Sequence, residues 1–330
     1  MINKVKEDLF YKGEFSFSYS SLNKLLFSPK LFYREYILKE RETKMDKHLI
    51  EGRLIHLLLL EPDRFDEEFV MTPLKMPTDS VKKILRIVSN RIVDPNNYIS
   101  LAELDDQILE ALKEEGLYQS FKEDQKRLDK IITIESETYF KFLQTTGKTI
   151  VDADTFARCM DRVHLIRAND EVTKLLMQEA TDFEMDTLEV YNEHKMEAKL
   201  TDFKFGIKGS IDKLIIDNEK KTATIIDLKT SGKSLENFAE SVDYFNYWLQ
   251  AAVYCLLVAK NFKENQDNYK IIFKFVVIDK YDQVYVFPVQ EGTIMKWTQG
   301  LADTLQRANY HYSERKYDLP YDFANRNVTL

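Results

Sequence analysis

Two aspartates and one lysine stand in neighbouring apolar segments, in a pattern that suits hydrolytic chemistry. Asp212 follows the run Gly-Ser-Ile, and Asp227 and Lys229 lie within Ile-Ile-Asp-Leu-Lys-Thr. An isolated Asp-x-Lys triplet is usually a charge pair on an edge strand, but an unpaired charge at the end of an apolar strand is costly. Carboxylates are good ligands for Mg²⁺ or Mn²⁺, and an ammonium beside them can orient or deprotonate a water molecule. The pattern therefore predicts a metal-dependent hydrolytic site.

The segments around these residues predict two antiparallel strands that would position them. Residues 211–216 and 222–226 are apolar and rich in β-branched side chains, and the polar run 217–220 predicts a turn between them. Pairing across that turn would bring the two aspartates together. Since side chains alternate along a strand, the second aspartate and the lysine should project from the same face.

Composition limits the class of protein. Of 330 residues, 44% are hydrophobic and 12% aromatic, which is enough for a globular core. No apolar run approaches the ~20 residues of a membrane span, and the polar N-terminus lacks a signal-peptide pattern. Cys159 and Cys255 form no Cys-x-x-Cys, which argues against a zinc ribbon, a disulfide framework or a four-cysteine iron–sulfur cluster. We therefore expect a cytoplasmic protein with no membrane partner.

The acidic net charge counts against an ordinary nucleic-acid binder. A formal charge of −8 disfavours affinity that comes from neutralising phosphates. A metal-dependent enzyme escapes this argument, because bound cations reverse the local sign of an acidic site. The charge therefore leaves a nuclease open.

Apolar periodicity predicts helices first and strands later. Residues 1–75 are expected to form a helical N-terminal part, and residues 76–150 a charged helical insertion that is interrupted at 94–97. Residues 151–330 should hold the core, a long helix over 235–259, and a C-terminal helix and tail, with all parts in one compact unit. The predicted fold class is α/β, with a mixed central sheet flanked by helices and a helical N-terminal region. Further strands are expected at residues 188–190, 196–205, 271–278 and 283–289.

The order of these motifs resembles that of a known family. Gly-x-x-x-Asp followed by Asp-x-Lys-Thr resembles the PD-(D/E)XK nuclease superfamily, and within it the exonuclease VIII-like branch of phage and prophage recombination exonucleases. The resemblance reaches from about residue 15 to about residue 290 and implies a restriction-endonuclease-like core. Its further matches are Ser18-Tyr19-Ser20-Ser21-Leu22, Gly52-Arg53-Leu54-Ile55-His56 with Leu60-Glu61-Pro62, and Gln250-Ala251-Ala252-Val253-Tyr254.

The resemblance implies a metal site and a catalytic group. Asp212 and Asp227, with His56 and the carbonyl of Leu228, would hold Mg²⁺ or Mn²⁺, and Lys229 would act on the attacking water. A further catalytic acid is expected on the preceding strand. Glu193 is the preferred residue for that role, and Glu189 and Glu197 compete with it.

DNA contacts are implied by two helices. Tyr247, Gln250 and Tyr254 recur at spacings of three and four, so they share a helix face, and Arg53 lies one turn before the histidine. The resemblance implies an exonuclease on double-stranded DNA in phage-type recombination or DNA processing. It also implies a single-strand annealing protein as partner, and homo-oligomerisation.

Two alternatives stay open. The first is a non-catalytic nucleic-acid-binding or phage-assembly module that keeps the nuclease fold, although the intact Asp, Asp and Lys argue against it. The second is a nuclease that acts on single-stranded or flap DNA or on RNA guides.

Overall fold

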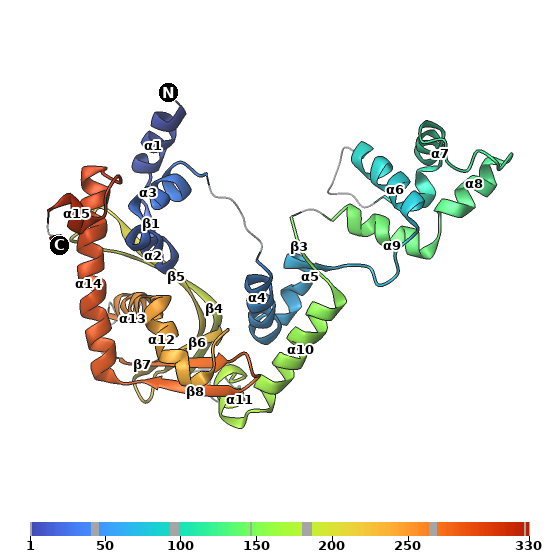
Figure 1. Cartoon of the computed structure of the whole chain (residues 1–330). Helices are drawn as coiled ribbons and strands as arrows, with labels where there is room; N and C mark the ends of the chain where they lie inside the picture. The colour runs from blue at the N-terminus through green and yellow to red at the C-terminus, as the bar shows by residue number, and fades with distance from the viewer. Residues whose placement is uncertain are drawn as a thin grey trace. The chain divides into compact units, whose positions relative to one another are not determined.

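The computed structural model describes residues 2–40, 46–92, 99–145, 147–179, 187–263, 269–326 and 328–329. It has the mixed α/β architecture expected from the sequence, and it divides into two compact units (Figure 1). The larger unit comprises Met1–Glu61 with Asp161–Leu330, and the smaller unit is Pro62–Met160. These boundaries differ from those drawn on the sequence, at 75/76 and 150/151. The interruption expected at residues 94–97 lies outside the described residues.

The larger unit is built on a mixed sheet, which has six strands within the described residues. At its centre β5 pairs antiparallel with β4 on one edge and with β6 on the other, and two residues of β1 join β5 in parallel. Beyond β6 the order continues with β7, parallel, and β8, antiparallel. The strands are β1 (Ser16–Phe17), β4 (Leu188–Lys199), β5 (Gly206–Asp217), β6 (Thr222–Thr230), β7 (Lys270–Ile278) and β8 (Val284–Val289).

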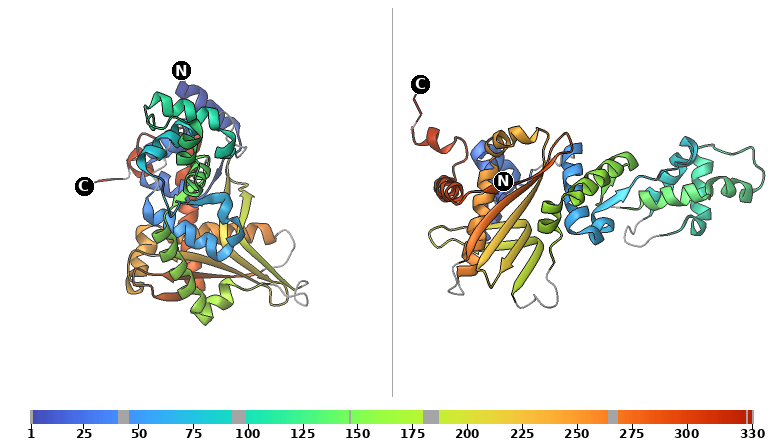
Figure 2. Two further views of the ribbon diagram at one scale, coloured as in Figure 1. Left: turned by 90° about the vertical axis from the view of Figure 1, so that its right-hand side faces the viewer. Right: turned by 90° about the horizontal axis from the view of Figure 1, so that it is seen from below.

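Helix α13 packs on four strands of this sheet and also against α14 (Figures 1 and 2). It can do so because apolar side chains surround most of it, the pattern of a helix buried between two layers. Helix α4 contacts β5 and β6. The helices of this unit are α1 (Ile2–Lys12), α2 (Tyr19–Phe27), α3 (Pro29–Phe32), α4 (Lys47–Leu60), the end of α10 (Ala153–Ala168), α11 (Asp170–Leu176), α12 (Phe238–Tyr244), α13 (Tyr247–Lys263), α14 (Glu291–Glu314) and α15 (Tyr321–Ala324), with a π-helical turn at Tyr33–Ile37 and 3₁₀ turns elsewhere.

The smaller unit is mostly helical and has a hydrophobic core of its own. Apolar residues of α6, α7, α8 and α9 meet in it, among them Ile84, Ile108 and Phe140. Strands β2 and β3 form a short parallel pair. The elements are α5 (Phe65–Glu68), β2 (Phe69–Met71), α6 (Asp79–Arg91), α7 (Asp105–Glu114), α8 (Asp124–Ile131), α9 (Ile134–Leu143), β3 (Thr149–Val151) and the start of α10.

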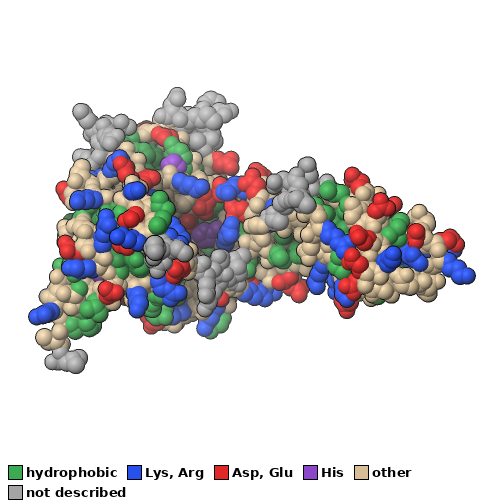
Figure 3. All heavy atoms as spheres, turned by 90° about the horizontal axis from the view of Figure 1, so that it is seen from above, with side chains coloured by type: hydrophobic (Ala, Val, Ile, Leu, Met, Phe, Trp, Pro, Cys, Tyr) green, Lys and Arg blue, Asp and Glu red, His purple; other side chains and the backbone are tan. Residues whose placement is uncertain are grey.

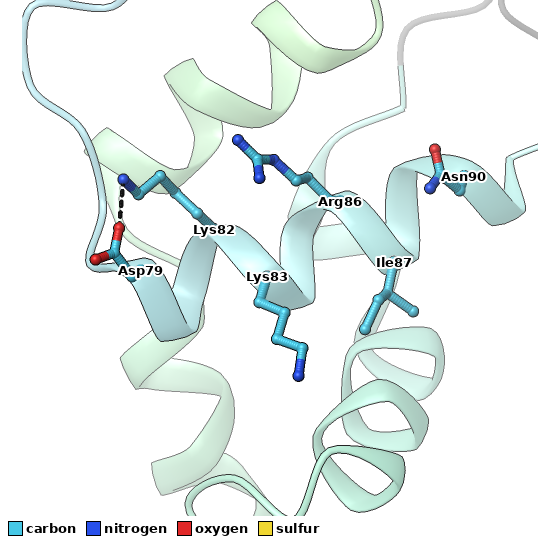
Figure 4. A pocket seen from close by; sticks show the side chains of 6 residues that line it. All are labelled: Asp79, Lys82, Lys83, Arg86, Ile87 and Asn90. Carbon is cyan, nitrogen blue, oxygen red and sulfur yellow. Dashed lines mark ion pairs between the residues drawn. The ribbon is translucent and has the colours of Figure 1, made fainter.

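A cleft of about 430 Å³ follows helix α6 in this unit (Figure 4). The cationic side chains that line the cleft have partners nearby. Nζ of Lys82 lies 2.6 Å from Oδ1 of Asp79, and Nε of Arg86 donates to the Tyr139 hydroxyl at 3.1 Å. Within the described residues the cleft holds no cluster of acids and histidines that could bind a metal ion. We therefore place the candidate site elsewhere.

Two details of the sequence-based expectation are wrong, and three short strands were missed. β4 is one continuous strand, and residues 200–205, which were expected to be extended, connect it to β5. The helix expected over 235–259 is broken at Asn246, which adopts the left-handed conformation (φ 56°) that asparagine tolerates better than most residues. The strands β1, β2 and β3 were not predicted, because two or three residues carry no measurable periodicity.

None of the helices that the structure describes is long and apolar enough to cross a membrane.

The contact between α13 and β5 requires a residue without a side chain at Gly209. A Cβ atom built there would lie 2.8 Å from Cε1 of Tyr254. Gly209→Ala should therefore lower the free energy of unfolding by about 1–3 kcal/mol, the usual cost of overpacking a core. Urea unfolding followed by circular dichroism measures this.

Gly292→Ala, in the first turn of α14, is the matched control, because a Cβ there meets nothing within 4 Å. It should be neutral or slightly stabilising. Equal stability of the two variants would show that α13 can move away from β5 without cost.

Candidate active site

The two aspartates lie where strands β5 and β6 separate. Their antiparallel ladder runs from Asp217↔Thr222 to Lys213↔Ile226, so the same register sets Asp212 opposite Asp227 one step further on. At that step the Leu228 N–H donates to Oδ2 of Asp212 at 2.7 Å instead of to a backbone carbonyl. A side chain thus ends the ladder and satisfies its last N–H group.

Asp227 and Lys229 form the buried half of the site. Asp227 is fully buried, and its Oδ2 lies 2.5 Å from Nζ of Lys229, whose side chain is 13% exposed. Despite this ion pair, neither carboxylate oxygen accepts a well-formed hydrogen bond from the described residues. A buried carboxylate with unused acceptor capacity is unusual in a folded protein and marks a place where a further ligand belongs.

The lysine of this pair stays charged. Burial alone would lower the pKa of Lys229, but the nearby charges of Asp227 and Asp212 outweigh it and raise the pKa above its usual value. Lys213, also buried, shows the opposite result: burial lowers the pKa of its ammonium to about 8, although this ammonium donates to the carbonyl of Gln178 at 2.7 Å. The difference arises from the carboxylates around Lys229.

Asp212 is the most perturbed acid of the site. Burial raises its pKa to about 7, and the negative charges of Asp227 and Glu193 act in the same direction. His56 and Lys229 oppose this shift because their positive charges stabilise the carboxylate. An acid that titrates near neutral pH in a cluster of charges is typical of functional sites.

Helix α4 brings His56 to these acids. Its Nδ1 lies 3.5 Å from Oδ2 of Asp212 and 3.9 Å from Oε1 of Glu193. The approach of α4 is close, since a Cβ on Gly52 would lie 3.1 Å from Oγ1 of Thr230 at the end of β6. Burial would lower the pKa of His56, but the charge of Asp212 and a hydrogen bond with Glu193 raise it. Thus the Gly-x-x-x-His motif serves both packing and the site.

Glu193 reaches the site through a strained backbone. It stands opposite Asp212 in the register of β4 and β5, it has a φ of 44°, and Ser210 donates to its Oε2 at 3.3 Å. A non-glycine residue in this region costs roughly 1–3 kcal/mol, and such strain concentrates at functional sites. The two competing acids lie elsewhere: Glu189 accepts from Tyr191 and Asn218, and Glu197 accepts from Ser16.

These residues fit a divalent cation. Ligand atoms of His56, Glu193 and Asp212 all lie within 4.8 Å of one another. Asp227, which the sequence predicts as a ligand, lies outside this group and pairs with Lys229. Carboxylates with one imidazole suit Mg²⁺ or Mn²⁺. Leu228, the other expected ligand, is buried between Asp227 and Lys229 in β6. Figure 3 shows acidic and histidine side chains gathered in a recess of the surface.

The residues expected to bind DNA do not form one surface. Gln250 and Tyr254 are buried, and Nε2 of Gln250 donates to the Tyr254 hydroxyl at 2.9 Å. Burial, followed by the charges of Asp212 and Asp227, raises the pKa of Tyr254 well above its usual value, so its hydroxyl stays protonated. The ring of Tyr247 lies 4.8 Å from Nζ of Lys229, and Arg53 is exposed on α4.

Tyr19 belongs to this neighbourhood, although we did not predict it from the sequence. Its hydroxyl donates to the carbonyl of Phe245 at 2.5 Å. Phe245 in turn stacks on Tyr247 at 5.4 Å. Burial raises the pKa of Tyr19, and the charges of Tyr247 and Asp227 add to the shift. The sequence feature that could have indicated Tyr19 is its position in the motif at residues 18–22. In that motif Ser18 and Ser21 form the capping box that begins α2.

Comparison with known proteins agrees with this geometry. The family model of the PD-(D/E)XK nuclease superfamily matches residues 16–317. Among solved structures, a candidate exonuclease from Eubacterium rectale shares 12% identity at a TM-score of 0.49, over 96% of this chain and 89% of that one. The protein SSO0001 shares 13% identity at a TM-score of 0.24, over 76% and 95%. Both TM-scores are too low to carry an argument. No curated protein sequence matches the chain.

The raised pKa of Asp212 predicts how the metal-free protein responds to pH. An unfolded aspartate titrates near ~3.9. Because the folded pKa is about 7, the folded state binds an extra proton between these values, so its stability is full below the unfolded pKa and falls as pH rises through about 7. The whole loss is on the order of 4 kcal/mol, at 1.36 kcal/mol per pKa unit, and roughly 3 kcal/mol of it falls between pH 5 and pH 8.

Asp212→Asn should remove most of this loss, since the amide oxygen can still accept the Leu228 N–H. Urea unfolding in EDTA at pH 5 and pH 8 measures the difference, with Asp303→Asn on the exposed face of α14 as control. If Asp212→Asn lost as much stability between these pH values as the wild type, the buried carboxylate would not be the titrating group.

Proposed function

The chain belongs to the PD-(D/E)XK nuclease superfamily, and on that premise we propose a metal-dependent exonuclease of the exonuclease VIII-like branch that degrades double-stranded DNA. One observation carries the proposal: Asp212, Asp227, Lys229 and His56 meet at the separation of β5 and β6. A non-catalytic module would have no reason to keep a fully buried acid whose carboxylate has unused acceptor capacity beside a charged lysine.

Nucleases of this superfamily use divalent metals, and we assign the ligands from the residues present. His56 and Asp212, whose ligand atoms lie close together with those of Glu193, would hold Mg²⁺ or Mn²⁺, and Glu193 would serve as the accessory acid. Asp227 and the carbonyl of Leu228 are further ligands that the resemblance implies. When bound, the cation supplies positive charge at the scissile phosphate and lowers the pKa of a water molecule.

Lys229 holds and orients the attacking water in this mechanism. The charges of Asp227 and Asp212 raise its pKa in the metal-free protein, so its ammonium can donate a hydrogen bond to the water. Its ammonium also stabilises negative charge that develops on the phosphate. The ring of Tyr247 restricts the side chain from one side and Asp227 fixes it from the other. Preorganised charge of this kind needs no rearrangement during the reaction.

The remaining residues position the substrate or the acids. We assign Arg53 and Tyr247 to contacts with the DNA strand, because both are at least partly exposed beside the site. The buried pair Gln250 and Tyr254 acts from behind the carboxylates, where its hydrogen bond fixes the tyrosine ring. We expect these two residues to support the strand contact indirectly.

The biological setting rests on the branch resemblance. We propose a role in phage-type recombination or DNA processing, with a single-strand annealing protein as partner and a homo-oligomeric enzyme. The smaller unit, Pro62–Met160, is then an insertion in the nuclease chain that selects among DNA substrates.

End-labelled linear duplex DNA and covalently closed circular DNA, incubated with Mg²⁺, Mn²⁺ or EDTA, test the proposal. The linear substrate should be degraded from its ends and the circle should stay intact, with no reaction in EDTA. Asp227→Asn, which keeps the size of the buried side chain, is the inactive control.

Cleavage of the circle would make the protein an endonuclease. Degradation of single-stranded DNA with an intact duplex would favour the alternative nuclease, and an inert wild type would favour the non-catalytic module.

His56→Ala should raise the Mn²⁺ concentration needed for activity and weaken Mn²⁺ binding about 10-fold or more, since one ligand is lost. Isothermal titration calorimetry and the Mn²⁺ dependence of cleavage measure the two effects. His48→Ala, an exposed position on the same helix, is the control. A variant with lower stability but an unchanged Mn²⁺ midpoint would make His56 a structural residue.

A further inference from the structure

Two aromatic side chains are exposed at the turn between α12 and α13. Tyr244 is 76% exposed and Phe245 is 44% exposed, and their rings meet edge to face at 4.9 Å. Burying a large aromatic ring usually stabilises the folded state, so a pair of rings held at the surface indicates a function there.

The turn is fixed in place. Asn246 lies between α12 and α13 and reverses the helical backbone there with a φ of 56°. Its side-chain amide donates to Oδ1 of Asn23 at 2.8 Å. The carbonyl of Phe245 accepts from Tyr19 at 2.5 Å and from Asn23 at 3.4 Å. The indole of Trp248 donates to Asn246 at 3.0 Å. A strained residue and four side-chain hydrogen bonds therefore hold the rings where they are.

The exposed rings adjoin the candidate active site. Phe245 stacks on Tyr247 at 5.4 Å, and Tyr247 in turn lies 4.8 Å from Nζ of Lys229. Nζ of Lys233 lies 6.0 Å from the ring of Tyr244 and forms an ion pair with Oε2 of Glu240 at 3.0 Å. Two ring contacts thus link the surface pair to the catalytic lysine. This arrangement matches a nucleic-acid strand, which alternates flat bases with phosphates.

We propose that Tyr244 and Phe245 form a stacking platform for an unpaired base of the DNA strand next to the scissile phosphate. The inference rests on the proposed function and specifies its substrate. Stacking of a base on an aromatic ring is comparable in strength to the stacking of one base-pair step, so the platform can replace what a terminal base loses when its pair opens. The enzyme therefore acts on ends that are open by one or two pairs.

A protein partner fits this surface less well. Stable protein interfaces bury about 800 Å² on each side, far more than two rings offer. Stacking also tolerates any base, because every base has a π face, and a nuclease that degrades DNA without sequence preference needs that tolerance.

Fluorescence of 2-aminopurine at the end of a duplex tests the platform. In the Asp227→Asn background, which prevents cleavage, binding of the full chain should quench the probe by stacking. Replacing both rings by alanine should abolish the quenching and weaken binding of frayed ends about 10-fold or more. Phe245→Leu, which keeps an apolar side chain and loses the ring, should show part of the same loss.

Tyr281→Ala and Tyr285→Ala remove rings of similar exposure in the β7–β8 region, 65% and 51%, and should leave the signal unchanged. In the active protein, the double alanine variant should cut blunt ends more slowly, and mismatches at the last two pairs should restore the rate.

The outcomes separate the two proposals. Unchanged quenching and affinity in the double alanine variant would overturn the platform. So would a wild type that degrades DNA while its Asp227→Asn variant binds the same DNA without quenching the probe. A wild type that quenches the probe but degrades no DNA with either metal would overturn the proposed nuclease activity and leave the stacking surface. Thermal unfolding of each variant checks that the fold is kept.

Discussion

The hydrogen bond from the Leu228 N–H to Asp212 is the interaction on which the rest of the site depends. It ends the β5–β6 ladder with a carboxylate, and the two strands separate at that point. Because the ladder closes on a side chain, Asp212 and Asp227 are held opposite each other below the surface. Burial raises the pKa of Asp212 to about 7, and the carboxylate of Asp227 keeps unused acceptor capacity beyond its ion pair with Lys229.

Such a cluster is unfavourable for the metal-free fold, and the surrounding structure offsets it. Lys229 supplies a positive charge at ion-pair distance, and α4 brings the imidazole of His56. Close packing holds these elements, through Gly52 against β6 and Gly209 against α13. The left-handed conformation of Glu193 adds strain at the same place. An apolar core that buries β5, β6 and α13 stabilises the fold enough to offset this strain.

The two units differ in character. The larger unit carries groups that can still bind a ligand. The carboxylate of Asp227 has unused acceptor capacity, and the rings of Tyr244 and Phe245 are exposed at their turn. The smaller unit has its own core and a cleft whose cations are matched within the unit, as in the pair Lys82 and Asp79. A unit that folds around its own core does not depend on the core that positions the candidate site.

The sequence by itself determined the strands around Asp212 and Asp227, their pairing and the side that Lys229 shares with Asp227, because these features follow from alternation over a few residues. The choice among Glu189, Glu193 and Glu197 was open to the sequence, since all three lie in one strand. Only the tertiary structure brought Glu193 to His56, broke the expected helix at Asn246 and buried Gln250. Those outcomes depend on contacts between residues far apart in the chain, such as Asn23 with Asn246, and no local pattern encodes such contacts.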